Sequence, residues 1–130
     1  NYDVVTMGNH DIETGYNVYD KIVKEIKAKV VVANLINEKT KEPYFKPYAI
    51  IKKNGIKIAV LGMIEPAIER QLPKILYEGI IAEDMIECAK KWIKIIKEKE
   101  KPDLIIGLFH SGANYTEDKE KYKNVRWKKR

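Results

Sequence analysis

The four residues Gly8-Asn9-His10-Asp11 carry the clearest potential for chemistry in this chain. They follow the apolar run at residues 4–7, so we expect them where a buried strand ends and a loop begins. An Asn amide oxygen beside an imidazole can hold a divalent metal, and the segment can also place a second nitrogen against a developing charge. The tetrad therefore indicates metal binding, acid–base chemistry, or both.

His110, the only other histidine, lies in the same kind of setting about a hundred residues downstream. The apolar run at 104–109 leads into it, and the small residues Ser111 and Gly112 follow. In α/β proteins, ligands usually bind at the carboxyl ends of the strands. Two strands that each deliver a polar side chain to one rim would provide the rigid support that a metal site requires.

Length and composition fit one globular domain and exclude several classes of protein. A chain of 130 residues with 45% hydrophobic residues can bury a core and is not disordered. No apolar stretch reaches the roughly 18 residues that span a bilayer. Cys88, the single cysteine, excludes an internal disulfide framework and a cysteine-based zinc site, and we interpret it as a buried helix residue.

The net charge of +6 is concentrated at one end of the chain. Residues 118–130 carry seven basic and two acidic residues, whereas the rest of the chain carries 18 basic and 17 acidic residues. The body is therefore nearly neutral, and we do not expect nucleic acid as a partner. The basic end would suit an anionic partner, although a solvated end is the simpler interpretation.

The elements that must position these residues alternate between strands and helices. Asn17 can cap a helix whose apolar residues recur at helical spacing as far as Ile26. A short buried strand at 30–33 follows. Asn54-Gly55, between two β-rich runs, predicts a hairpin with a type I′ turn.

The second half of the chain continues this alternation. We expect residues 67–82 to be irregular, 83–100 to form an amphipathic helix that Pro102 ends, and 103–109 to form the last strand. The order predicts an α/β fold, and the hairpin makes its sheet mixed rather than wholly parallel. The fold class expected is therefore α/β, with layered mixed β-sheets flanked by helices.

Four short motifs, in this order, resemble the calcineurin-like metallophosphoesterase family. They are Gly8-Asn9-His10-Asp11, Val32-Ala33-Asn34, the run at 57–62 (Lys-Ile-Ala-Val-Leu-Gly) and His110-Ser111-Gly112. The resemblance is closest to the branch that contains 5′-nucleotidases and 2′,3′-cyclic-nucleotide phosphodiesterases. It extends to about Asn114.

The resemblance implies a fold of two facing mixed sheets flanked by helices, of which this chain holds an incomplete part. Residues 1–114 would be the central part of the catalytic domain, and residues 115–130 a charged C-terminal tail. The intact family site holds two divalent ions, and Zn, Mn or Fe suit Asn and His ligands. The substrate implied is a nucleotide or another phosphate ester.

The resemblance also implies a role for each site residue. Asn9, through its amide oxygen, and His110, through an imidazole nitrogen, would bind the same metal. His10 would face the scissile phosphate and protonate or stabilise the leaving oxygen. Glu13 holds the position of the acidic neighbour that orients this histidine, and Asp11 is the alternative; the sequence leaves the choice open.

Several family ligands are missing from these 130 residues. An Asp-x-His and a Gly-Asp pair should precede the first motif, and a Gly-His-x-His block should follow the last. We therefore expect a central fragment that lacks the N- and C-terminal segments of a longer protein and is inactive by itself. The alternative is a non-catalytic domain that binds an anionic partner through its basic tail.

The sequence also bears on two further positions and on the cellular compartment. Asn34 is interpreted as a structural residue that ends its strand, and Glu65 stands where the family has Thr. Members of the family are often periplasmic or extracellular, but no targeting segment is visible, so the compartment stays open.

Overall fold

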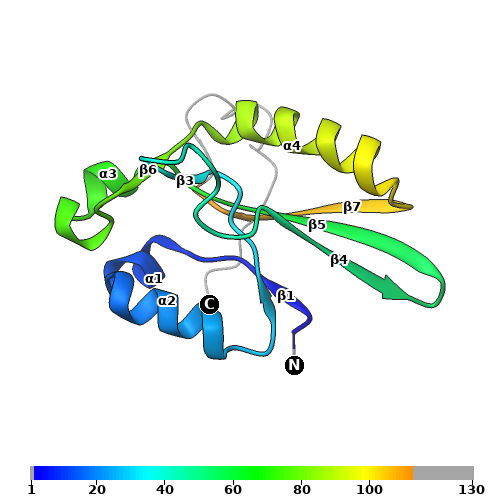
Figure 1. Ribbon diagram of the computed structural model, residues 1–130, viewed down its shortest axis with the longest axis horizontal. Helices are drawn as coiled ribbons and strands as arrows, with labels where there is room; N and C mark the ends of the chain where they lie inside the picture. Colours follow the sequence, from blue (N-terminus) through cyan, green and yellow to red (C-terminus); the bar gives the residue numbers. More distant parts are fainter. Residues whose placement is uncertain (1, 113–130) are drawn as a thin grey trace, which may run out of the picture.

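The computed structural model describes residues 2–112 of the 130-residue chain. The strands form one three-stranded sheet and two two-stranded sheets, with helices on both sides of them (Figure 1). The expected α/β class with layered mixed sheets flanked by helices is confirmed, for part of a domain. The charged tail at 115–130 lies outside the described residues.

No helix within the described residues has both the length and the apolar character needed to cross a membrane.

The three-stranded sheet has the order β4-β5-β7. Strand β4 (Tyr48–Lys53) pairs antiparallel with β5 (Ile56–Ile64), and β5 pairs parallel with β7 (Leu104–His110). Asn54 and Gly55 join β4 to β5 with φ angles of 51° and 79°. Positive φ at both positions is what a type I′ turn requires, so the hairpin prediction is confirmed.

Helix α4 (Met85–Glu100) covers one face of this sheet, at the top of Figure 1. It begins at Asp84, whose carboxylate accepts the backbone N–H groups of Ile86 and Glu87 at 2.9 and 3.0 Å. Six fully buried side chains fill the space between helix and sheet: Ala33, Ala59, Leu61, Met63, Cys88 and Ile96. Burial raises the pKa of the Cys88 thiol to about 11, which agrees with an inert packing role.

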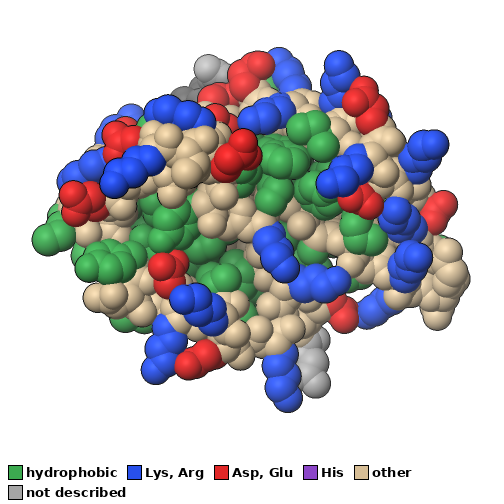
Figure 2. Space-filling view, viewed as in Figure 1, with side chains coloured by type: hydrophobic (Ala, Val, Ile, Leu, Met, Phe, Trp, Pro, Cys, Tyr) green, Lys and Arg blue, Asp and Glu red, His purple; other side chains and the backbone are tan. Residues whose placement is uncertain are grey.

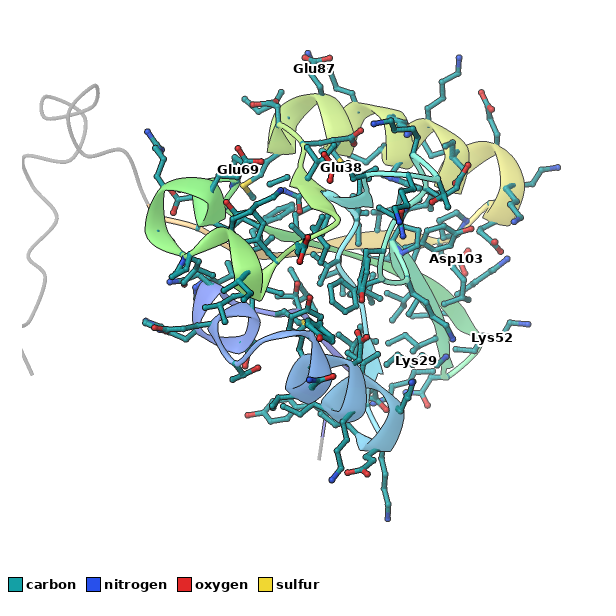
Figure 3. All side chains as sticks on the ribbon, turned by 60° about the vertical axis from the view of Figure 1, so that its left-hand side comes forward. Lys29, Glu38, Lys52, Glu69, Glu87 and Asp103 are labelled. Atoms are coloured by element: carbon teal, nitrogen blue, oxygen red, sulfur yellow. The ribbon has the colours of Figure 1, made fainter. Side chains whose placement is uncertain are left out.

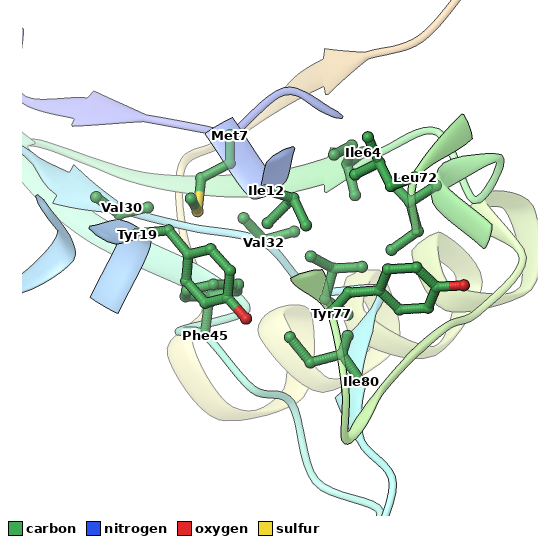
Figure 4. Close-up of a cluster of buried hydrophobic side chains, with 12 residues drawn as sticks. Met7, Ile12, Tyr19, Val30, Val32, Phe45, Ile64, Leu72, Tyr77 and Ile80 are labelled. Carbon is green, nitrogen blue, oxygen red and sulfur yellow. The ribbon is translucent and has the colours of Figure 1, made fainter. Parts of the chain in front are cut away.

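The N-terminal part of the chain forms a second layer below the sheet in Figure 1. Strand β1 (Val4–Val5) pairs parallel with β2 (Lys29–Val30), and helices α1 (Asn9–Glu13) and α2 (Tyr16–Glu25) connect them. Figure 4 shows the core between these elements and the rest of the molecule, where Met7, Ile12, Tyr19, Val32, Phe45, Ile64 and Ile80 converge.

Two local expectations for this layer are wrong. The tetrad does not enter a loop, because Gly8 caps a short helix that begins at Asn9. Asn17 does not cap α2, because Gly15, with φ of 81°, reverses the chain and lets the helix begin at Tyr16. A glycine adopts this left-handed backbone without strain, and its carbonyl accepts the first hydrogen bonds of the helix.

The expectation of an irregular segment at 67–82 is also wrong. The segment contains helix α3 (Ile68–Gln71), the 3₁₀ turn η1 (Lys74–Leu76) and strand β6 (Ile80–Ala82), which pairs antiparallel with β3 (Leu35–Asn37). These elements are too short to show a periodic pattern in the sequence. Strand β6 forms because it pairs with β3, about 45 residues away.

The segment at 31–34 connects the two layers through its backbone. Only the start of the strand expected at 30–33 pairs as a strand, within β2. The N–H of Val31 donates to Val5 at 2.9 Å, that of Val32 to Lys46 at 2.8 Å, and that of Ala33 to Gly62 at 2.7 Å. All three side chains are fully buried. One extended segment therefore attaches β1 to the three-stranded sheet.

Gly62 allows this segment to approach β5 closely. A methyl group at position 62 would overlap the carbonyl oxygen of Val31, and the backbone cannot move without breaking the hydrogen bonds between the layers. We predict that Gly62→Ala lowers the free energy of unfolding by at least about 3 kcal/mol, as overpacking against backbone does. Urea unfolding followed by circular dichroism measures this loss.

Gly79→Ala is the matched control for this prediction. Gly79 has φ of 80° but nothing within 4 Å of an added methyl group, so only the left-handed backbone resists the substitution. It should cost about 1 kcal/mol. Equal losses in the two variants would contradict a steric role for Gly62.

Candidate active site

Asn9 and His110 come together although 101 positions separate them in the sequence. Asn9 is the first residue of α1, shortly after β1, and His110 is the last residue of β7. The Oδ1 atom of Asn9 lies 3.1 Å from Nε2 of His110. The His110 side chain is exposed and Asn9 is half-buried, so the pair is open to solvent.

The position of His110 depends on the end of strand β5. Ile64 is its register partner, and the N–H of Glu65 donates to the His110 carbonyl at 2.8 Å. Ile64 is held in turn by Asn34, whose fully buried amide donates to its carbonyl at 2.7 Å and accepts its N–H at 3.0 Å. The same Asn34 amide donates to Glu83 at 3.1 Å. Asn34 therefore has the structural role expected for it.

The position of Asn9 depends on the short helix α1. Gly8 precedes this helix, and its N–H donates to the carboxylate of Asp11 at 2.7 Å, while the N–H of Asp11 donates back to the Gly8 carbonyl at 3.1 Å. Gly8 also lies against the His110 ring: an added Cβ would be 2.9 to 3.1 Å from three ring atoms. The end of β7 and the start of α1 thus meet at a position without a side chain.

His10 has an acidic neighbour on the same helix. Its Nδ1 atom lies 2.7 Å from Oε2 of Glu13, one helical turn away, and its side chain is 85% exposed. Asp11, the alternative neighbour, is occupied with the Gly8 N–H. Of the two residues that the sequence left open, Glu13 is therefore the one that contacts the His10 ring.

The geometry of the Asn9–His110 pair fits two ligands of one metal ion. Two N or O ligands at about 2.1 Å from an ion lie roughly 3.0 to 3.4 Å apart for right-angled or tetrahedral coordination. The separation of 3.1 Å falls within this range. A catalytic ion normally takes three or more protein ligands, and residues 2–112 contain no cluster of three or more His, Cys, Asp or Glu side chains that could hold a metal. The described residues thus fit part of a metal site.

Glu65 lies next to this pair, a placement that sequence reasoning missed. It follows the last residue of β5, its backbone bonds to His110, and its half-buried carboxylate lies 3.5 Å from the N–H of Gly112. Glu65 comes beside His110 because the parallel pairing of β5 with β7 places the preceding residue, Ile64, in register with His110. That pairing joins strands about 45 residues apart and leaves no local signal in the sequence.

Comparison with known proteins identifies relatives of this segment. The chain is 38% identical over 112 residues to a 5′-nucleotidase of Vibrio cholerae, a match that covers 85% of this chain and 20% of the relative. It is 30% identical over 123 residues to a 2′,3′-cyclic-nucleotide 2′-phosphodiesterase/3′-nucleotidase of Haemophilus influenzae, covering 88% of this chain and 19% of that protein. The chain thus spans about a fifth of the length of these curated relatives. No protein-family model matches it.

A solved structure shares the fold. The calcineurin-like phosphoesterase YfkN of Bacillus subtilis aligns with a TM-score of 0.80 and 30% identity, over 88% of this chain and 36% of that one. The relatives are named as phosphoesterases, which does not favour the alternative of a non-catalytic binding domain. The chain is therefore homologous to a segment of the calcineurin-like phosphoesterases of the 5′-nucleotidase type, as its motifs predicted.

Proposed function

We propose that this chain supplies the central part of the active site of a metal-dependent phosphate-ester hydrolase that acts on nucleotides, as a segment of a longer protein. Residues 1–114 would belong to its catalytic domain. The observation that carries the proposal is the 3.1 Å approach of Asn9 Oδ1 to His110 Nε2 at the ends of two separate elements. The names of the relatives, a 5′-nucleotidase and a cyclic-nucleotide phosphodiesterase, support the substrate class.

Asn9 and His110 would hold one divalent ion, with Zn, Mn or Fe suited to an amide oxygen and an imidazole nitrogen. A pair of such ions, when bound, neutralises charge on the phosphate and lowers the pKa of a coordinated water. The protein's contribution is to fix the two donors before the ion arrives. The backbone N–H of Glu65 does this for His110, supported by the Asn34 side chain that holds Ile64. The Gly8–Asp11 cap does so for Asn9.

His10 would act on the leaving oxygen of the substrate. Its Nδ1 is held by Glu13 at 2.7 Å, which sets the direction of the ring and leaves Nε2 available on the exposed side. A protonated ring that donates Nδ1–H to Glu13 can pass its Nε2 proton to the departing oxygen as a general acid. Because His10 and Glu13 share one helix, this orientation does not require any other part of the chain.

The 130-residue chain alone is proposed to be inactive. Asn9 and His110 provide only two metal ligands. The remaining ligands of a two-metal site would come from the four fifths of the relatives' length that this chain does not cover. Glu65 is close to His110, but its carboxylate is turned toward the Gly112 N–H.

We predict that Gly8→Ala weakens Zn²⁺ binding by about tenfold, because the added methyl group displaces the His110 ring from Asn9. The free energy of unfolding should fall by no more than about 1 kcal/mol, the usual effect of Ala at a helix N-cap. Isothermal titration calorimetry and urea unfolding measure the two quantities. Gly112→Ala, whose methyl group would have its nearest neighbour at 4.0 Å, is the matched control and should bind as the original chain does. Unchanged affinity in Gly8→Ala would argue against the pair as a metal site.

The catalytic proposal can be tested by exchanging the aligned 112-residue segment of the Vibrio cholerae 5′-nucleotidase for the corresponding part of this chain. We predict that the chimera releases phosphate from a nucleoside 5′-monophosphate, whereas the 130-residue chain alone does not. His10→Ala and His110→Ala in the chimera should each lower the rate by more than about a hundredfold, through the acid and the metal ligand respectively.

Lys52→Ala is the control for the chimera, since Lys52 lies near the hairpin end of the sheet (Figure 3). It should leave the rate unchanged. A folded chimera that retains full activity without His10 or His110 would contradict the roles proposed here.

A further inference from the structure

A pocket of about 520 Å³ lies between helix α4 and strand β4, and it shares no residue with the Asn9–His110 pair. Its apolar lining includes the rings of Tyr48 and Trp92, whose centroids are 5.9 Å apart at an interplanar angle of 54°. Proline and aliphatic side chains complete this lining. Apolar side chains below α4, bordered by lysines, are visible on the face shown in Figure 2. The volume falls within the range of roughly 300 to 1,000 Å³ that is usual for small-ligand sites.

The charged side chains that line this pocket are all positive. They are Lys29, Lys46 and Lys99, and no Asp or Glu is among the lining residues. Lys29, which lies beside β4 in Figure 3, donates to the Ile50 carbonyl at 2.7 Å. Among the described residues, Lys46 and Lys99 have no carboxylate partner. The charged groups that flank the apolar lining are therefore cationic and, within the described part of the chain, not held in ion pairs.

The nearest acidic group is engaged elsewhere. Glu100 accepts a hydrogen bond from the Tyr48 hydroxyl at 2.9 Å and lies 3.4 Å from Lys57 Nζ. These contacts hold the pKa of Glu100 below its usual range, so the carboxylate stays charged and paired with Lys57. Glu100 also interacts with Lys99 through space, but no ion pair joins the two side chains.

Trp92 contributes an unsatisfied donor to the same region. Its indole Nε1 is the one buried side-chain nitrogen or oxygen within residues 2–112 that has no hydrogen-bond partner. This N–H is enclosed by protein atoms, so it does not itself face the pocket. The cations and the apolar lining together favour a ligand with an apolar body and an anionic end.

We propose that this pocket binds a small amphiphilic anion, with its apolar body between β4 and α4 and its carboxylate or phosphate group at Lys46 and Lys99. A small molecule is the occupant that the pocket volume favours, because the volume falls in the range of small-ligand sites. The site is independent of the phosphoesterase proposal, since neither its residues nor its ligand take part in that chemistry.

Decanoate and decyl phosphate, kept below their micelle concentrations, are suitable probes, and decanol is the uncharged counterpart. Trp127→Phe leaves Trp92 as the only tryptophan, so its fluorescence reports on the pocket. We expect saturable binding of at least one anion, with little response to decanol. Lys46→Gln/Lys99→Gln should weaken the binding by roughly fivefold or more, since charged hydrogen bonds are lost.

Lys94→Gln/Lys97→Gln is the matched control, because it removes the same charge from residues of α4 that are outside the pocket lining. It should retain the affinity of the Trp127→Phe chain, and circular dichroism verifies that both double variants are folded. A preference for decanoate or for decyl phosphate identifies the anionic group. Equal binding of decanol, equal weakening in the two double variants, or no saturable change in Trp92 fluorescence would each overturn the proposal.

Discussion

The arrangement of the whole molecule depends on the backbone hydrogen bonds of one buried extended segment, residues 31–34. Its N–H groups donate to Val5 of β1, to Lys46 just before β4 and to Gly62 of β5. Its last side chain, Asn34, bonds to Ile64 and Glu83. Residues 31–34 are themselves fully buried, so an N–H or amide group of this segment that lost its partner would be left unsatisfied at a cost of about 1 to 3 kcal/mol. The segment therefore sets where β1 ends relative to β5 and β7.

The candidate site follows from that constraint. Asn9 comes after β1 and His110 ends β7, so their distance is decided by how β1 is placed relative to β5 and β7. Gly62 permits the close approach of the layers, and Gly8 permits the close approach of the His110 ring. Two glycines far apart in the sequence thus remove the steric obstacles between β1 and the ends of β5 and β7. His10 and His110 are exposed, whereas Asn34 and Ile64, which position the end of β7, are fully buried.

The sequence predicted the features that have a local physical signal. The Asn54-Gly55 turn, the amphipathic helix that Asp84 caps, and the apolar run ending at His110 are each encoded within a few neighbouring residues. The short elements at 67–82 were missed because β6 exists through its pairing with β3. The cap of α1 was missed because the run at 4–7 reads as a continuous strand, although only Val4–Val5 pairs.

The same distinction holds for the site. The types and order of Asn9, His10 and His110 pointed to metal and phosphate chemistry, but not to which acidic residue meets His10. That choice depended on the cap of α1, in which Asp11 turns back to the Gly8 N–H and leaves Glu13 for the imidazole. The position of Glu65 beside His110 likewise required the register of two parallel strands.

The central claim is that Asn9 and His110 form a ligand pair for a divalent ion, and calorimetric titration of Zn²⁺ and Mn²⁺ into the purified chain tests it most directly. The original chain, His110→Ala and His10→Ala should be compared at the same pH. Our account predicts stoichiometric binding that His110→Ala abolishes and His10→Ala retains, because His10 is assigned to the substrate and not to the metal. Absence of binding in the original chain, or equal losses in the two variants, would contradict it.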